Sequence, residues 1–359
     1  MAGRRITKAG ALPYIGMVMA ECAQVGLMIV SKVAMSDGMS SFIFVLYSNA
    51  LASLILLPSS FLFHRSSERQ SPPLTASILS GFFLLGLFGC LAQIFGYAGI
   101  NLSSPTLGTA MLNLVPGFTF VLAAIFRMEK LDWRSSSTVA KSLGTIVSIA
   151  GAFIVTYYKG IPLASFPSSS NSSSHPLLLQ QSNWVVGGLF LAADCVMASA
   201  FLIVQALILK KYPMELIVVF FYCFFVTILS TIVCLVIERD STAWSVKPRI
   251  RLLAVLYSGI FGSAFQVGVS TWCLHRTGPV FVSMFKPLGI VIAAAVGVIF
   301  SGDTLYLGGL IGASVIVIGF YTVMWGKAKE EKLDVDATVN SSEPGSHKFP
   351  LLQTHTTEI

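Results

Sequence analysis

Two long stretches of the chain carry no formal charge, and they restrict the fold more than any other feature. Between Arg69 and Arg127 lie 57 residues without Asp, Glu, Lys or Arg, and between Glu215 and Glu238 lie 22. A helix that crosses a bilayer needs roughly 20 mostly apolar residues, so the first stretch is long enough for two crossings. Strands of a membrane barrel would alternate apolar and polar residues, which these stretches do not. The sequence therefore predicts an all-α integral membrane protein.

The overall composition excludes several other classes of protein. Of the 359 residues, 55% are hydrophobic and 11% are charged, whereas a soluble domain carries about 25% charged residues. The 23 basic and 16 acidic side chains are too few to solvate a globule of this size. We therefore exclude a soluble enzyme, a nucleic-acid-binding module and a disordered scaffold, and we expect the lipid bilayer as the surrounding medium.

The hydrophobic pattern predicts ten membrane-spanning helices. Of the 23 basic residues, 16 fall in segments that are cytoplasmic if the N-terminus is cytoplasmic, and five fall on the opposite side. Because cytoplasmic loops collect Lys and Arg, this bias predicts that both termini face the cytoplasm. The predicted spans cover residues 13–34, 40–63, 77–98, 105–126, 139–157, 184–208, 215–237, 252–273, 279–300 and 304–325.

The two halves of the chain share a pattern of residues. The sequence Gly86-Leu87-Phe88-Gly89 followed by Gln93 recurs 173 positions later as Gly259-Ile260-Phe261-Gly262 followed by Gln266. At the same offset, Glu21-Cys22 recurs as Asp194-Cys195. Such matches in the same order indicate a duplication. Because each half has five predicted spans, an odd number, the second half must lie inverted in the membrane, which is a recurring plan of transporters.

The repeat and the composition together predict the domain organisation. A Ser- and Pro-rich segment separates the halves and is expected to be a flexible linker on the non-cytoplasmic side. The last segment is charged, rich in Ser and Thr and without apolar periodicity, so we expect it to be disordered. The predicted units are a first five-helix repeat over 1–157, the linker over 158–183, a second five-helix repeat over 184–326 and a cytoplasmic tail over 327–359.

Three ionisable residues lie deep inside predicted spans and are the first candidates for a transport site. They are Glu21 in the first span, Asp194 at the matching position of the sixth, and Lys286 in the ninth. A charged group within a bilayer is costly, so each is a functional hypothesis. A carboxylate in such a cavity can exchange a proton or attract the ammonium group of an amino acid, and Lys286 can hold a carboxylate. The alternative is that these groups pair with one another only to hold helices together.

Uncharged residues complete the predicted substrate- or proton-binding set. Gln93 and Gln266 are the symmetric neutral pair, and they either line the cavity or bridge helices by hydrogen bonds. Pro116 and Pro287 are expected to break their helices and so expose backbone carbonyls. Six cysteines show no metal-ligand spacing, and neither a catalytic residue, a metal nor a cofactor is predicted. The full binding set is Glu21, Gln24, Gln93, Asn113, Asp194, Gln266 and Lys286.

Several motifs resemble those of a known plant family. They include Asn113-Leu114-Val115-Pro116-Gly117-Phe118 and, most strongly, Gly278-Pro279-Val280-Phe281-Val282-Ser283-Met284-Phe285-Lys286-Pro287-Leu288. With these motifs the chain, from about residue 12 to 330, resembles the Walls-Are-Thin-related transporters, also called nodulin-21-like or UMAMIT proteins, which carry two EamA repeats of the drug/metabolite transporter superfamily. The resemblance implies a ten-span carrier of amino acids or related metabolites, of auxin in some members, at the plasma membrane or the vacuolar membrane. Asp303 stands where such families often have Glu.

Taken together, these observations favour a secondary transporter that works by alternating access, with proton coupling left open. No nucleotide-binding motif of the form G-x-x-x-x-G-K-[ST] occurs, so direct drive by ATP is not expected. A membrane enzyme is disfavoured, because no H-E-x-x-H motif occurs and the five histidines lie in predicted loops, span edges or the tail. A carrier of auxin or another organic acid and a receptor without transport are the alternatives. The oligomeric state is not indicated.

Overall fold

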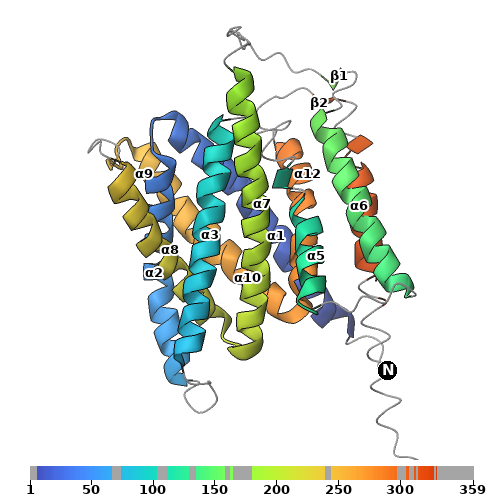
Figure 1. The fold of residues 1–359 in the computed structure, drawn as a ribbon, viewed down its shortest axis with the longest axis horizontal. Coiled ribbons are helices and arrows are strands. Elements are labelled where there is room, and N and C mark those ends of the chain that lie inside the picture. The colour runs from blue at the N-terminus through green and yellow to red at the C-terminus, as the bar shows by residue number, and fades with distance from the viewer. Residues whose placement is uncertain are drawn as a thin grey trace, which may run out of the picture.

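The computed structural model of this chain is a bundle of long helices that run side by side (Figure 1). The structure describes residues 6–66, 74–102, 111–112, 114–128, 135–157, 162–164, 180–238, 244–296, 305–306, 311–312, 314–326 and 329. Asn113, Asp303 and the predicted tail beyond Lys329 lie outside the described residues.

The described helices follow the predicted order. In the first half they are α1 (Ile6–Ser36), α2 (Ser41–Ser66), α3 (Ala76–Leu102), α5 (Val115–Ile125) and α6 (Ser136–Tyr157). In the second half they are α7 (Gln180–Lys211), α8 (Glu215–Ile237), α9 (Arg249–Tyr257), η1 (Ser258–Gln266), α10 (Val267–Thr277), α11 (Pro279–Met284) and α12 (Lys286–Val296), followed by a helix over Ser314–Gly326.

Six helical stretches in the described part of the chain are long and apolar enough to cross a membrane. Large apolar side chains project from their outer faces, for example Leu54 and Leu189, each 67% exposed, and Leu235, 69% exposed. In water such a surface would be unstable, so it marks the face that lipid covers. The protein is therefore a multi-pass integral membrane protein. The six stretches are Ala11–Met35, Ser41–Pro58, Ala76–Gly99, Val186–Lys211, Glu215–Ile237 and Arg249–Thr277.

The span predicted over residues 252–273 is a composite helix. It begins as α9, continues as the π-helix η1 and ends as α10. A π-helix has wider turns than an α-helix and is uncommon beyond a single turn. The matching stretch of the first half, within α3, is regular α-helix. The repeated sequence therefore did not predict this difference between the two halves.

One short pair of strands departs from the predicted all-helical fold. Strand β1 (Pro162–Ala164) pairs antiparallel with β2 (Leu305–Tyr306). The first strand lies in the segment interpreted as a flexible linker and the second at the start of the predicted tenth span. The pairing therefore connects the middle of the chain to its C-terminal part, and no periodicity in either stretch signalled it.

Glycines of the repeat motif mark where helices approach one another closely. A Cβ atom at Gly86 would lie 2.5 Å from Cβ of Phe225, and one at Gly259 would lie 2.6 Å from Cδ2 of Leu51. Gly86 and Gly259 are 173 positions apart, and Leu51 and Phe225 are 174 apart. The same helix contact is therefore made twice, at positions related by the offset of the sequence repeat.

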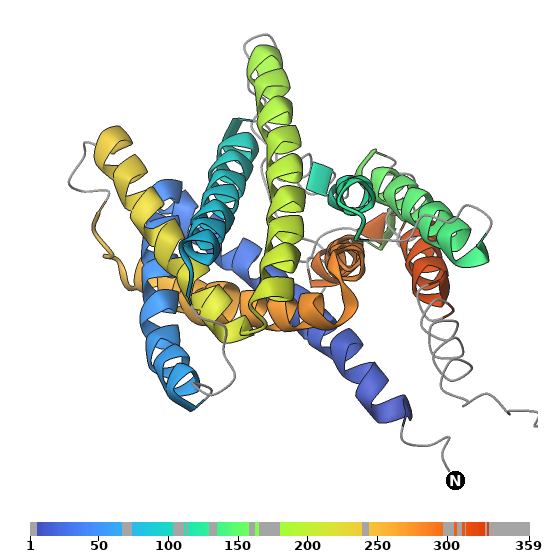
Figure 2. The ribbon, with the colours of Figure 1, turned by 60° about the horizontal axis from the view of Figure 1, so that its bottom comes forward.

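The helices α6 and Ser314–Gly326 lie against each other at one edge of the bundle, where the green and red ribbons run together (Figure 2). A Cβ at Gly144 would lie 2.7 Å from the backbone oxygen of Gly319, and one at Gly151 would lie 3.0 Å from that of Gly312. Only residues without a side chain allow backbones to approach this closely. The close approach thus involves Gly144 and Gly151 of α6, Gly319 within the second helix, and Gly312 two positions before that helix begins.

Candidate substrate site

Glu21 and Lys286 form an ion pair in the interior of the bundle. Nζ of Lys286 lies 3.1 Å from Oε1 of Glu21. The side chain of Glu21 is only 2% exposed, whereas that of Lys286 is 27% exposed. Helix α1 supplies the acid and the first residue of α12 supplies the base. The structure therefore joins two of the three ionisable residues that the sequence singled out.

A glycine makes room for the carboxylate of Glu21. A Cβ atom at Gly289, which lies on α12 three positions after Lys286, would be 2.9 Å from Oε2 of Glu21. Any side chain at this position would push the carboxylate away from α12. The close approach of α1 to α12 thus depends on Gly289 as well as on the ion pair.

Lys286 stands at a break between two helices. Helix α11 ends at Met284, and α12 begins at Lys286 with Pro287 as its second residue. Proline has no backbone N–H and is tolerated in the first turn of a helix, where that group would have no partner. Around the break the backbone forms tighter turns, since the N–H of Phe285 donates to the oxygen of Val282 at 3.3 Å. The break brings the ammonium group to the start of a helix.

The first half contains a similar break. Helix α5 begins at Val115 with Pro116 as its second residue, and the N–H of Leu114 before it donates to the oxygen of Met111 at 2.9 Å. Pro116 therefore occupies the same position in α5 that Pro287 occupies in α12. Asn113, the polar candidate on this side, lies outside the described residues.

Asp194 is buried on α7 and has no ion-pair partner among the described residues. Its side chain is 8% exposed, and it packs against Gly96 of α3, where a Cβ atom would lie 3.0 Å from Oδ2. It lies close enough to Lys286 and to Tyr97 to interact with both electrostatically. Within the described part of the chain, no hydrogen bond or ion pair of this carboxylate is found. Glu21 and Asp194, equivalent in the sequence repeat, therefore differ in their partners.

Gln93 lies between two neighbouring helices. Nδ2 of Asn49, on α2, donates to Oε1 of Gln93 at 3.3 Å, and Nε2 of Gln93 donates to the hydroxyl of Tyr222, on α8, at 2.9 Å. Both ends of the carboxamide are thus engaged by side chains of the protein. Gln24, on α1, and Gln266, at the end of η1, are half-buried.

Comparison with known proteins identifies the family. The model of the EamA-like transporter family matches residues 12–157 and again residues 185–325. The chain belongs to the EamA-like transporter family. It is 47% identical to WAT1-related protein At3g28050 of Arabidopsis thaliana, over 98% of each chain. WAT1-related protein At5g40240 of the same plant is 45% identical over 97% of this chain and 93% of that relative. The resemblance to the plant WAT1-related family is confirmed.

A solved structure supports the fold of this EamA-like transporter independently. The crystal structure of another protein superposes with a TM-score of 0.63. The alignment covers 90% of this chain and 99% of the other, at 16% sequence identity. At that identity the similarity concerns the fold alone. The family, the relatives and the apolar helices together establish a membrane transporter of the drug/metabolite superfamily.

Some neighbours of the candidate site in this transporter were not predicted from the sequence. Tyr97 is half-buried and lies close enough to Asp194 of α7 and to Ser31 of α1 to interact with both electrostatically. Tyr222 holds Gln93, and Gly96 and Gly289 flank the two carboxylates. A tyrosine within a hydrophobic span is usually a packing or interfacial residue, so these contacts could not be predicted from the sequence. Among the described residues, no group of three His, Cys, Asp or Glu side chains could hold a metal ion.

Proposed function

We propose that this transporter is a secondary carrier of amino acids or related small metabolites that works by alternating access. In this proposal the chain crosses the membrane ten times as two inverted five-helix repeats, with both termini in the cytoplasm. Two findings support it: the family model matches the chain twice, and the contact of Gly86 with Phe225 recurs as that of Gly259 with Leu51. Two similar halves of opposite orientation can exchange conformations, so a site between them opens to each side in turn.

The arrangement of Glu21, Asp194 and Lys286 is the single observation that carries the choice of substrate. A zwitterionic amino acid brings one carboxylate and one ammonium group, and the protein offers one ammonium group and two carboxylates within a low-dielectric interior. The substrate carboxylate would bind Lys286, which is the more exposed partner of the ion pair. Its ammonium group would bind Asp194, the carboxylate without an ion pair in the described structure. Both charges of the substrate would then be compensated away from water.

Glu21 has a different place in this proposal. Without substrate it neutralises Lys286, and substrate binding weakens that ion pair as the substrate carboxylate competes for the ammonium group. A carboxylate that loses its counter-ion in such an environment favours the protonated form. Glu21 is therefore the proposed point at which a proton couples to transport.

The remaining candidates fall into two groups. We propose that Gln24, Gln266 and Asn113 line the cavity around the charged residues, together with the carbonyl groups exposed near Pro116 and Pro287. Gln93 is better placed to hold helices α2, α3 and α8 together, because both ends of its side chain are engaged. The membrane in which the protein acts would be the plasma membrane or the vacuolar membrane.

Flux measurements with the purified protein in liposomes test this function. The liposomes are loaded with one labelled amino acid at a time, or with labelled auxin, and efflux is followed at pH 5.5 and pH 7.5 against empty liposomes. We expect efflux of at least one zwitterionic amino acid to exceed that from empty liposomes at least tenfold. Flux of auxin alone would replace the proposal by an organic-acid carrier. Absence of flux for every compound would favour a receptor without transport.

A further inference from the structure

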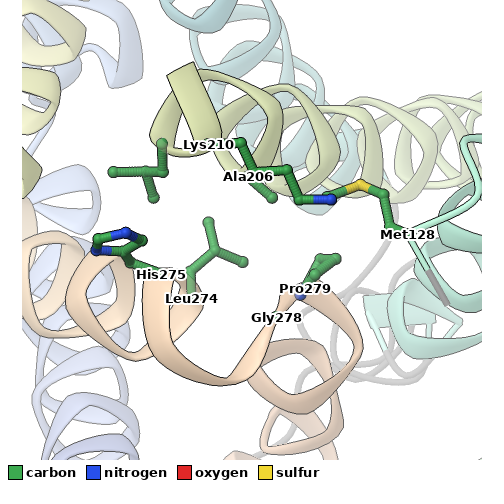
Figure 3. A pocket seen from close by; sticks show the side chains of 8 residues that line it. Met128, Ala206, Lys210, Leu274, His275, Gly278 and Pro279 are labelled. Atoms are coloured by element: carbon green, nitrogen blue, oxygen red, sulfur yellow. The ribbon is translucent and has the colours of Figure 1, made fainter. Parts of the chain in front are cut away.

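A second polar feature lies at one end of the bundle, away from Glu21 and Lys286. Here a pocket opens between the end of α7, the end of α10 and the start of α11 (Figure 3). Most of its wall is apolar, and Lys210 and His275 supply the ionisable groups. The lining residues are Met128, Ala206, Leu209, Lys210, Leu274, His275, Gly278 and Pro279.

Lys210 has no ion-pair partner within the described part of the chain, which distinguishes it from its neighbours. Nδ1 of His275 lies 2.6 Å from Oε1 of Glu215, so the imidazole and that carboxylate are paired with each other. The guanidinium group of Arg276 lies over the ring of Trp272, 4.9 Å from its centre. Lys210 is exposed and flanks the pocket from the last turn of α7. The pocket therefore presents, beside an apolar wall, one ammonium group that has no ion-pair partner among the described residues.

Further cations surround the pocket. Each of three lining residues is followed or preceded in sequence by an exposed basic residue: Arg127 beside Met128, Lys211 beside Lys210, and Arg276 beside His275. The only acid that contacts a lining residue in the described structure, Glu215, is bound to His275. Basic groups outnumber acidic ones even when Glu129, which follows Met128 in the sequence, is counted with Glu215. A positive charge balance favours an anionic ligand and disfavours a ligand that also carries a quaternary ammonium group.

The shape and position of the pocket indicate an amphiphilic ligand. It lies at the ends of membrane-spanning helices, close to where the exposed apolar residues Ile125 and Phe126 mark the lipid-facing surface. Gly278 has φ of 88°, and a Cβ atom there would meet nothing within 4 Å, so the wall at this point is open. The volume of about 100 Å³ leaves room for a small polar group such as a phosphate.

We propose that this pocket binds the phosphate group of an anionic phospholipid, with Lys210 as its counter-ion. The glycerol and the acyl chains lie outside the pocket, toward the exposed apolar side chains of Ile125 and Phe126. The charge distribution of the sequence predicts that this end of the bundle faces the cytoplasm, where membrane leaflets carry anionic lipids. Pro279 begins α11, which leads directly to Lys286, so the lipid contacts the helix pair that carries the transport site.

Thermal unfolding of the purified full-length protein in a neutral detergent tests the proposal. Short-chain phosphatidylglycerol and phosphatidylcholine with the same acyl chains are titrated separately, and inorganic phosphate is titrated in a third series. A ligand that binds the folded state raises Tm in a concentration-dependent way. We expect phosphatidylglycerol to raise Tm and to saturate, and phosphatidylcholine and inorganic phosphate to have less than a third of that effect.

Variants of two adjacent lysines assign the effect to the pocket. Lys210→Gln should raise the half-saturating concentration of phosphatidylglycerol at least tenfold, and Lys210→Arg should keep it within threefold of the original. Lys211→Gln removes the same charge from the next position, which is also exposed but does not line the pocket, and should change the half-saturating concentration less than threefold. Equal effects of Lys210→Gln and Lys211→Gln would overturn the proposal. Equal stabilisation by phosphatidylcholine would also overturn it. A response to inorganic phosphate equal to the response to phosphatidylglycerol would overturn the lipid as ligand and show a site for free phosphate instead.

Discussion

Lys286 and Glu21 lie 3.1 Å apart, and they join the ninth predicted span to the first across the interior of the transporter. Removal of one partner of a buried ion pair leaves an uncompensated charge, which typically costs about 3–5 kcal/mol. A substitution of Lys286 therefore affects both of the roles considered for it, the binding of substrate and the pairing of α1 with α12. Single substitutions cannot separate them unless the partner is also changed.

A pair of variants separates these roles for Lys286. In Lys286→Met, we expect reduced protein abundance and a KM raised at least tenfold, because both the ion pair and the proposed carboxylate contact are lost. In the double variant Glu21→Gln with Lys286→Met, no charge is left unpaired, so abundance should return to at least half of the original. The KM of the double variant should stay high. Recovery of a normal KM together with abundance would show that Lys286 is only structural.

Glu21→Gln alone tests the proposed coupling to protons. The amide keeps the shape of the side chain but cannot exchange a proton, so uptake should either fall at least tenfold or become independent of pH between 5.5 and 7.5. Membrane insertion should stay intact, as judged by abundance in the membrane fraction, because the Lys286 side chain left without its partner is 27% exposed and can be hydrated, unlike the 2% exposed Glu21 that Lys286→Met leaves unpaired. Cys22→Ser is the control, because Cys22 is the next residue on α1 and is exposed. Uptake that keeps its pH dependence in Glu21→Gln would remove the proposed role.

The sequence identified the charged residues of the site but not how they are arranged. Glu21, Asp194 and Lys286 stand out because ionisable groups within apolar spans are rare. Their pairing could not be derived, since either acid was an equally good partner for Lys286 and the choice depends on the packing of α1 against α12. Gly289 is decisive for that packing, yet in the sequence it is one of 30 glycines.

The helices were predictable for a similar reason, and their irregularities were not. Continuous apolar stretches gave the membrane class and the order of the helices, because burial in lipid acts on every residue of a span. The π-helix η1 arises in a stretch whose counterpart in α3 is regular, although both carry the same Gly-x-x-Gly pattern. The neighbours of the two glycines differ, since Leu51 and Leu27 pack against η1 where Phe225 and Tyr222 pack against α3.

Tyr222→Phe tests whether Gln93 holds helices together or contacts the substrate. The substitution removes the hydroxyl that accepts a hydrogen bond from Nε2 of Gln93 at 2.9 Å. Hydrogen bonds between membrane helices are worth about 0.6–2 kcal/mol, so Tm should fall by a few degrees. KM for the transported amino acid should stay within twofold of the original. A KM raised more than fivefold with unchanged Tm would instead place Gln93 in the cavity.

Gly144→Ala tests the crossing of α6 with the helix over Ser314–Gly326. The added Cβ would lie 2.7 Å from the backbone oxygen of Gly319 and 2.8 Å from the backbone nitrogen of Val323, so the helices must separate. Gly268→Ala is the matched control, since a Cβ atom at Gly268 on α10 meets nothing within 4 Å. In a helix, Ala is more favourable than Gly by roughly 0.5–1 kcal/mol, so the control should unfold at the same or a higher temperature. Gly144→Ala should lower Tm by several degrees, and a Tm equal to that of the control would show that the two helices are not held by close backbone contact.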